Sequence, residues 1–374
     1  MSGPAHPSTF LPSTVADILR SNAAAAEINR DLTPDQLALV YDQQWFRMLM
    51  PENTSMPQPS PVAQPLPLPE LVRLEEGLSW ADGSVGWTVT LCSGAGWFAG
   101  FFAPTAYPEI LSNAHLCLAG SGAPSGEAHV IPGGYRVNGR WEYASGSLHA
   151  TAFTANCVIV ANGQKVLTKE GAPLIRPFLF RKEEVVVEMT WNTIGLIATG
   201  SHSFRITNIE VPADRCFIIE AAHATDKHPI YRYPFLQLAE ATLAANLSGM
   251  AIHFLDCCAD LFGQRAIQRN FSTAAVEEMQ YALNAGTEEM NSLRREFFIA
   301  VEESWPAPED QAPENHLLSA VSRTARTLAT GARQIVDQLY PYGGLGAARP
   351  DTEINRVWRD FHTASQHNLL VFRR

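Results

Sequence analysis

One segment of the sequence combines small residues with a polar side chain in a way that suits binding of a planar ring. It follows Trp141 and contains Ala144, Ser145 and Gly146. Small side chains let a backbone approach a flat group closely, and the Ser145 hydroxyl or nearby N–H groups can bond to its polar edge. His149 follows the same loop and is expected to face the pocket. The segment is thus compatible with a planar group lying against the backbone, and the other interpretation is an ordinary hairpin with Trp141 in the core.

The 11 histidines and six cysteines do not predict a metal site. The cysteines form no Cys-x-x-Cys pair and no Cys/His ladder of the kind that binds zinc. His362 and His367 are five residues apart, so their side chains would diverge on a helix. We expect reduced thiols packed in the core of a cytoplasmic protein. No Gly-x-Gly-x-x-Gly fingerprint, Walker loop or nucleophile elbow occurs, so no nicotinamide site of its own is evident.

Composition excludes several classes of protein. The chain has 374 residues, 27 Lys and Arg against 38 Asp and Glu, and a net charge of −11, which does not suit a nucleic-acid binder. The hydrophobic share of 46% supports a large core. The sequence shows no signal peptide in its first 30 residues and no run of 18 apolar residues, so we expect no contact with a membrane.

The hydrophobic pattern divides the chain into three parts and predicts an α+β fold. We expect an N-terminal helical domain over 1–114, a central β domain over 115–222 and a C-terminal helical bundle over 223–374. A connector with seven prolines, residues 51–69, is expected to be extended. The four helices expected in the bundle are 236–262, 273–305, 317–340 and 352–372.

Turn signals and period-two alternation place the strands. Pro132-Gly133-Gly134 and Asn138-Gly139 both predict turns. The expected strands are 135–137, 140–143, 153–160, 184–189 and 202–211.

Three stretches carry a resemblance to a known family. They are residues 133–146 (GGYRVNGRWEYASG), residues 193–201 (TIGLIATGS), and YGGLG at 342–346 followed by RVWRDFHTASQH at 356–367. Together with the order of elements they resemble the acyl-CoA dehydrogenase superfamily, over about residues 10–372. The similarity is greatest to its reduced-flavin-dependent monooxygenases, such as the oxygenase component of 4-hydroxyphenylacetate hydroxylase.

The resemblance implies a fold, a cofactor and a set of site residues. The fold would be an N-terminal helical domain, a central β domain and a four-helix bundle, assembled as a homotetramer. FAD or FMN would bind between the β domain and the bundle, supplied in reduced form by a separate flavin reductase. Arg356 and Asp360, four apart in the Arg-x-x-Arg-Asp signature, are expected to pair. The residues implied for the cofactor are Trp141, Ala144, Ser145, Gly146, Trp191, Gly343, Gly344 and Arg359. Those implied for the substrate are Trp87, Trp97 and His149.

Departures from the dehydrogenase pattern favour the monooxygenases. Many dehydrogenases place a catalytic Glu where this chain has Asn368, and an amide cannot remove a proton. His367 precedes it, as in the monooxygenase branch, and would act as acid or base, with Ser145 assisting. The flavin-binding Arg and Gln of dehydrogenases fall at about Ala259 and Tyr340. These losses suit a flavin that arrives reduced and leaves oxidised.

Two alternatives stay open at this stage. One dehydrogenase subgroup carries its base on the first bundle helix, within about one residue of Glu240, so this chain could oxidise an acyl-CoA thioester with FAD. A non-redox descendant that only binds a ligand is the second alternative. The sequence does not name the substrate, beyond favouring a hydrophobic or aromatic small molecule.

Overall fold

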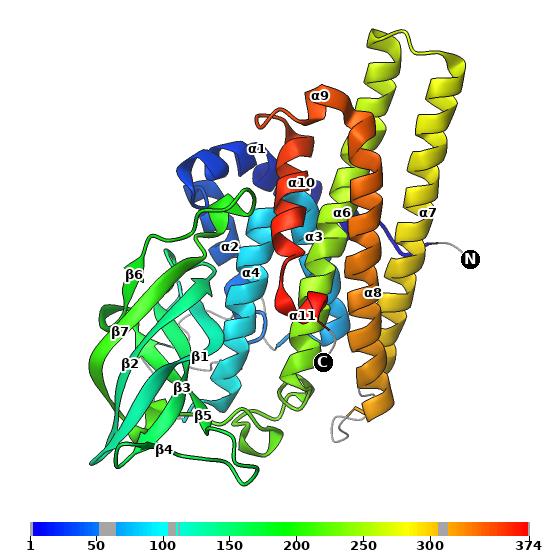
Figure 1. Ribbon diagram of the computed structural model, residues 1–374. Helices are drawn as coiled ribbons and strands as arrows, with labels where there is room; N and C mark the ends of the chain where they lie inside the picture. The colour runs from blue at the N-terminus through cyan, green and yellow to red at the C-terminus, as the bar shows by residue number, and fades with distance from the viewer. Residues whose placement is uncertain (1–2, 52–64, 104–109, 111–112, 306–312, 373–374) are drawn as a thin grey trace.

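The computed structural model describes residues 3–51, 65–103, 110, 113–305 and 313–372. Within these ranges the chain forms helices, then a sheet, then long helices, which is the predicted α+β order. In Figure 1 the sheet lies on one side of the molecule and the long helices lie on the other. Most of the proline-rich connector falls outside the described residues, and its last residues begin a helix at Leu68.

The N-terminal helices begin where local capping favours it. Thr33 starts α2 with a capping box, in which its hydroxyl accepts from the Gln36 N–H and the Gln36 side chain accepts from the Thr33 N–H. Asp82 caps α4 by accepting from the Val85 N–H. The four helices of this part are α1 (Ser13–Asn29), α2 (Pro34–Asp42), α3 (Leu68–Ala81) and α4 (Gly83–Gly96).

The sheet has the strand order β4-β3-β1-β2-β7-β6, with β5 pairing to β3. The pair β1–β3 is parallel and the other pairs are antiparallel. Its aromatic core contains Trp141 stacked on Phe204 with ring centroids 5.2 Å apart. The strands are β1 (Leu118–Ile131), β2 (Gly134–Ala144), β3 (Ala152–Ala161), β4 (Gln164–Lys165), β5 (Ile175–Arg181), β6 (Val186–Glu188) and β7 (His202–Pro212).

One predicted turn is wrong. Pro132 and Gly133 do connect β1 to β2, but Asn138 and Gly139 lie inside β2. The register shifts there, and a Cβ on Gly139 would lie 2.6 Å from the Gly126 Cα on β1. The Asn-Gly pair therefore makes a bulge where two backbones approach closely, and not a hairpin turn.

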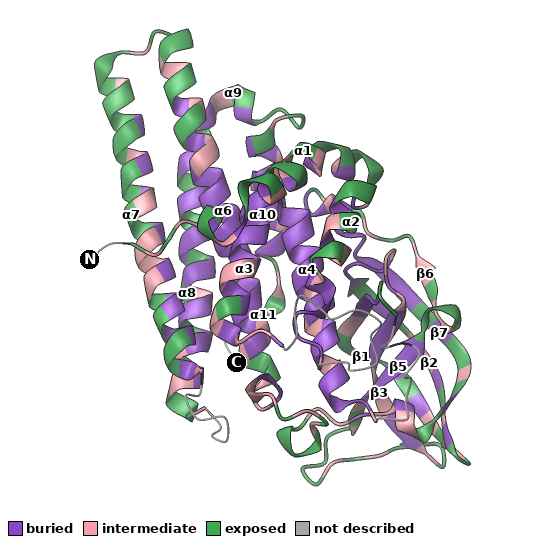
Figure 2. Cartoon of the chain, turned by 180° about the vertical axis from the view of Figure 1, so that it is seen from behind, coloured by how far each residue is buried: buried purple, intermediate pink, exposed green. Residues whose placement is uncertain are grey.

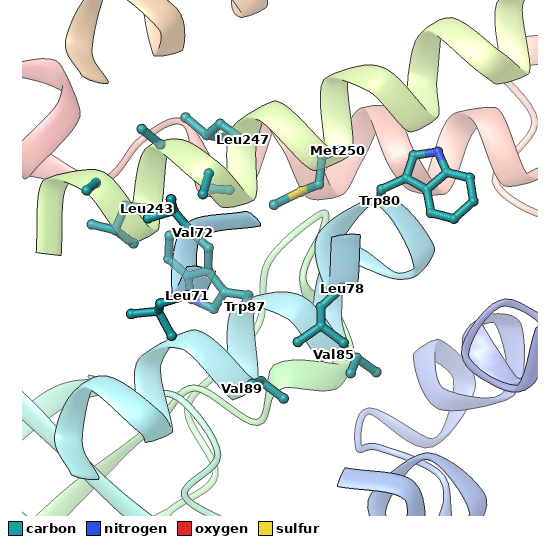
Figure 3. Close-up of a cluster of buried hydrophobic side chains, with 14 of the residues drawn as sticks. Leu71, Val72, Leu78, Trp80, Val85, Trp87, Val89, Leu243, Leu247 and Met250 are labelled. Carbon is teal, nitrogen blue, oxygen red and sulfur yellow. The ribbon is translucent and has the colours of Figure 1, made fainter. Parts of the chain in front are cut away.

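The long helices pack side by side, with α6 at the centre. Helix α6 contacts α3, α7, α8 and α10, and Figure 2 shows it buried over most of its length. Figure 3 shows the apolar cluster that joins α6 to α3 and α4, with Trp87 of α4 inside it. The helices are α6 (Phe235–Gln268), α7 (Thr273–Ser304), α8 (Asn315–Leu339), α9 (Gly344–Ala347), α10 (Glu353–Ala364) and α11 (Asn368–Val371).

The predicted last helix, 352–372, is broken in two. Helix α10 ends at Ala364, and α11 starts after His367, whose Nδ1 accepts from the Leu369 N–H at 3.4 Å. The break turns His367 out of the helical pattern that α10 follows. Each helix in the described part of the chain is too short or too polar to cross a membrane.

Candidate cofactor and substrate site

An open pocket of about 510 Å³, referred to below as the cavity, lies between the loop that follows β6 and the helices α8 and α10. Its volume falls in the range of small-molecule sites, roughly 300–1,000 Å³. The loop contributes Thr193 and Ile194, and α8 contributes Arg333 and Asp337. The lining residues from α10 and just after it are Trp358, His362, Thr363 and Gln366.

Three side chains on this cavity keep a buried polar atom that forms no hydrogen bond with any described residue. The atoms are Trp358 Nε1, His362 Nε2 and Thr363 Oγ1. The Asp337 carboxylate is 3.1 Å from His362 Nε2, but the two are not in hydrogen-bond geometry. Buried polar groups in folded proteins nearly always have a partner, so three on one cavity point to a ligand with matching polar atoms.

His362 is a titratable residue on the cavity wall whose pKa is shifted by its surroundings. Burial lowers the pKa of its imidazole; the nearby Asp337 carboxylate opposes this shift and the Arg333 guanidinium adds to it. The neutral ring is thus favoured near neutral pH and can donate or accept a hydrogen bond. The Trp358 ring packs against it with centroids 4.3 Å apart. The cavity therefore combines an aromatic wall with adaptable polar groups.

Arg359 and Asp360, also on α10, hold the helix against the same loop. The Arg359 guanidinium donates to the Ile194 carbonyl at 2.7 Å and pairs with Glu27 of α1. Asp360 accepts from the Leu196 N–H. Burial, and next the neighbouring Asp82, raise the pKa of Asp360 to about 7. In this structure Arg359, expected to bind the cofactor, is committed to holding the loop.

Gly195 allows this close approach. A Cβ there would lie 2.1 Å from the Arg359 carbonyl oxygen, so only glycine fits between the loop and α10. Arg356 forms no ion pair with Asp360 among the described residues, although its charge lowers the Asp360 pKa somewhat. The expected pairing is thus replaced by bonds to the loop backbone.

The Ser145 loop is linked to the same segment by a chain of buried hydroxyls. The Ser145 and Ser201 hydroxyl oxygens are 2.8 Å apart, and Ser201 is 2.7 Å from the Thr199 hydroxyl. Thr199 in turn donates to the Leu196 carbonyl at 2.8 Å. The Ser145 hydroxyl is therefore already bonded, which makes it a support for the loop behind Thr193 in the structure as it stands.

The backbone conformation and the packing at position 146 both require glycine. Its φ of +71° favours glycine, and a Cβ there would lie 2.4 Å from the Cys92 sulfur on α4. The preceding Ala144 is fully buried at the end of β2. These small residues are packed against α4 and the sheet core. The sequence analysis expected them to face a cofactor ring instead.

Trp141 lies in the sheet core, but its neighbour Tyr143 is exposed. The Trp141 ring is fully buried and its Nε1 donates to the Asn156 carbonyl at 2.9 Å. Tyr143 is 68% exposed, has a φ of +65°, and meets the Trp191 ring edge-on at 6.0 Å. Sequence analysis missed Tyr143 because alternation places it on the same face as Trp141, and the irregular backbone reverses that.

Trp191 is half-buried, and hydrogen bonds fix its place on the loop. Its Nε1 donates to the Leu196 carbonyl at 2.9 Å, and its backbone N–H donates to His202 Nδ1 at 3.0 Å. His149, expected near the substrate, instead lies 2.8 Å from the Asp31 carboxylate. The loop that lines the cavity is thus held from several sides.

His367 and Trp87, which were predicted separately, lie together. Their ring centroids are 6.0 Å apart in an edge-on contact. Gln366, next to His367, reaches the cavity. Trp97 does not join them, because its ring is almost fully buried against Phe235 and its Nε1 donates to the Ile230 carbonyl.

Glu240 and the Gly343-Gly344 pair lie elsewhere. Glu240 is 1% exposed and pairs with Arg326 of α8 at 2.7 Å, so it is not a solvated helix carboxylate. Gly344 has a φ of +61° and packs against Arg265 of α6 at the turn into α9. None of these three residues lines the cavity.

Comparison with known proteins identifies the fold. Residues 241–372 match the family model for the acyl-CoA dehydrogenase C-terminal domain. The oxygenase subunit HsaA of a flavin-dependent monooxygenase from Rhodococcus jostii is 25% identical over 368 residues, covering 93% of this chain and 91% of that protein. The oxygenase component of an FADH2-dependent resorcinol hydroxylase from Rhizobium is 27% identical over 67% of this chain and 60% of that protein.

Among solved structures, the HsaA monooxygenase of M. tuberculosis superposes with a TM-score of 0.83 at 21% identity, covering 96% of this chain and 92% of that one. The expected fold and the expected resemblance are both confirmed. The C-terminal part of the chain matches the acyl-CoA dehydrogenase family model, and the chain as a whole is similar to oxygenase subunits of flavin-dependent monooxygenases.

Proposed function

We propose that this chain is the oxygenase component of a two-component flavin-dependent monooxygenase that hydroxylates an aromatic small molecule. The observation that carries the proposal is the cavity in which buried polar atoms make no hydrogen bond with a described residue. These atoms belong to Trp358, His362 and Thr363. Relatives named as flavin-dependent oxygenases, one of them a resorcinol hydroxylase, supply the chemical class.

The cavity residues fit a flavin. An isoalloxazine ring has an apolar benzenoid end and a polar edge of carbonyl and ring-nitrogen atoms. Trp358 and Ile194 offer apolar surface, while the Trp358 N–H and the Thr363 hydroxyl can bond to the polar edge. When bound, reduced flavin supplies the electrons that activate molecular oxygen. FAD is our choice over FMN, because the resorcinol hydroxylase uses FADH2.

The substrate would lie on the side of Trp87 and His367. Trp87 offers an aromatic wall, and His367 stands at its edge. An imidazole there can take the proton of a phenolic hydroxyl and so make the ring a better nucleophile. The clamp of Arg359 and Asp360 holds the loop against α10, which keeps water out of the junction.

Other parts of the proposal rest on the family resemblance. The chain shows no nicotinamide fingerprint, so a separate reductase would deliver the reduced flavin. We expect a homotetramer in the cytoplasm, where the six cysteines, all free, would stay reduced. The acyl-CoA dehydrogenase alternative is not supported, since Glu240 is held in an ion pair with Arg326.

The test replaces His367 with alanine. We expect hydroxylation of a panel of simple phenols to fall by about 10²–10⁴-fold, the usual contribution of a general acid or base. Reduced flavin, titrated without oxygen, should bind with unchanged affinity, because His367 does not line the cavity. Product formation is measured by chromatography, with flavin reduced chemically so that no reductase is needed.

His316→Ala is the matched control, because His316 is 72% exposed on α8. It should leave both flavin affinity and hydroxylation unchanged. Full activity in His367→Ala would remove this histidine from the scheme. Failure of the unaltered protein to bind reduced flavin at all would overturn the proposed function.

A further inference from the structure

A second cluster of chemically capable side chains lies away from the cavity, where α6 meets the start of α10. His253 and Cys257 are one turn apart on the same face of α6. Glu353 is the first residue of α10, and its carboxylate lies 3.0 Å from His253 Nε2. One potential ligand atom from each of the three residues lies within 4.8 Å of the other two.

The donor set selects among metal ions. An imidazole nitrogen, a thiol sulfur and a carboxylate oxygen together suit Zn²⁺, which binds all three. Mg²⁺ and Ca²⁺ require oxygen ligands, so they do not suit this group. Bond lengths of about 2.0–2.3 Å put neighbouring ligands of a tetrahedral zinc within about 4 Å of one another. The three atoms therefore need only small side-chain movements to close on an ion.

The surroundings do not oppose a cation. Arg20 and Arg356 act on Glu353, and the carboxylates of Asp256 and Asp260 act on Cys257. Two positive and two negative neighbours balance one another. Asp256 is already engaged with His6 and with the Trp80 indole N–H, so it is not a ligand in this arrangement.

Coordination would make the site neutral and leave it one ligand short. A Cys257 thiolate and the Glu353 carboxylate together carry two negative charges, which match Zn²⁺, and the thiol proton passes to solvent. Three protein ligands leave a fourth position for water. His253 is buried and Glu353 is half-exposed, which gives an ion a path from solvent.

We propose that His253, Cys257 and Glu353 form a zinc site that fastens the start of α10 to α6. Glu353 and His362 are nine residues apart on α10, or about 13 Å along the helix axis. An ion at the first turn would thus limit the tilt of the helix whose other end lines the cavity. The site is separate from the proposed flavin chemistry and does not depend on it.

The test uses the full chain without a polyhistidine tag. After treatment with EDTA, the protein is titrated with Zn²⁺ against a chromophoric chelator, and then with Co²⁺ to record its absorption spectrum. We expect one Zn²⁺ per chain and, with Co²⁺, a thiolate charge-transfer band in the near ultraviolet together with the intense visible bands of tetrahedral cobalt.

Cys257→Ser should abolish the charge-transfer band and weaken zinc binding by at least tenfold. A loss of about tenfold is already typical when a group that only supports a metal ligand is removed, and Cys257 would be a ligand itself. Cys258→Ala is the matched control, because Cys258 is the next residue but is buried and outside the group. It should keep the band and the affinity. Absence of stoichiometric binding, or a band that survives in Cys257→Ser, overturns the proposal, and circular dichroism shows whether each variant is folded.

Discussion

Two groups of side chains on α10 differ in how their polar atoms are satisfied. In the clamp pair, Arg359 and Asp360 bond to the backbone of the loop at 194–196. In the cavity group, Trp358, His362 and Thr363 each keep a buried polar atom that makes no hydrogen bond with a described residue. Side chains of one helix thus make satisfied contacts with the loop and leave polar atoms unsatisfied at the cavity.

This difference separates stability from binding. A satisfied buried group stabilises the folded chain, and its removal leaves the partner unpaired at a cost. An unsatisfied buried polar group destabilises the folded chain while no ligand is bound. Such a group is therefore expected where a ligand forms the missing hydrogen bond. We therefore expect the clamp pair to govern folding and the cavity group to govern ligand affinity.

The largest expected effect comes from Arg359→Ala in the clamp pair. The change leaves Glu27 without its cation and the Ile194 carbonyl without its donor, and both lie in a poorly solvated junction. We expect a loss of about 3 kcal/mol in the free energy of unfolding, measured by urea denaturation without ligand. Arg349→Ala, which breaks an exposed pair with Asp351, should leave the free energy of unfolding almost unchanged.

Arg359→Ala also tests the earlier expectation that Arg359 binds the cofactor. If it only clamps, the folded variant should bind reduced flavin almost as the parent does. A stability near that of the parent, combined with a large loss of flavin affinity, would show that Arg359 belongs with the ligand-binding group and not with the clamp pair.

Helix α3 offers a case that could break the comparison. Glu76 is fully buried and pairs with Arg294 at 2.7 Å, whereas the adjacent Glu75 is also fully buried. Neither Glu75 oxygen makes a hydrogen bond of good geometry with a described residue, although the Thr90 hydroxyl lies nearby. Burial raises the pKa of Glu75 to about 8. Glu75 is thus unsatisfied, yet it does not line the cavity.

Glu75→Gln should therefore become progressively more stable than the parent as pH rises. The unfolded Glu75 releases its proton near pH 4.5, but the folded one keeps it until about pH 8. The unfolded state thus binds fewer protons in this window, and parental stability falls as pH rises through it. Glutamine does not titrate, so the difference should grow steadily between about pH 5 and pH 8.

Urea denaturation at several pH values measures this difference. Glu76→Gln serves as the contrast, because it breaks the ion pair with Arg294 and should destabilise the protein at pH 7. A constant difference between Glu75→Gln and the parent at every pH would show that the Glu75 carboxyl is satisfied in solution.

The sequence predicted the helices and strands better than it predicted the site. Long amphipathic patterns predicted α6, α7 and α8, and the alternation at 202–211 predicted β7. The strand β1 was missed because its Gly- and Ser-rich stretch has little alternation. The sequence predicts a turn at Asn138-Gly139 where the structure has a bulge, because bulges and hairpin turns favour the same residue types.

The site was harder because its residues meet only in three dimensions. His362 was considered as a metal ligand with His367 and set aside, while its actual neighbours, Arg333 and Asp337, come from another helix. The backbone reversal at Tyr143 and the cap at His367 also depend on tertiary context. His253 and Cys257 do carry a local signal, a four-residue spacing, but Glu353 lies 96 residues after Cys257 in the printed sequence.

The smallest expected effect comes from Thr363→Val in the cavity group, and it tests the comparison most directly. Valine keeps the shape of threonine and removes the buried hydroxyl, which has no partner among the residues described. The free energy of unfolding should stay level or rise by up to about 1 kcal/mol, because an unsatisfied polar group is lost. The affinity for reduced flavin should fall by about fivefold, since one hydrogen bond of about 1 kcal/mol to the ligand is lost. Thr287→Val on α7, whose hydroxyl donates to the Leu283 carbonyl, should leave flavin affinity unchanged. If Thr363→Val were clearly destabilising and left flavin affinity intact, its hydroxyl would be bonded within the protein, and the two groups of α10 side chains would not differ in kind.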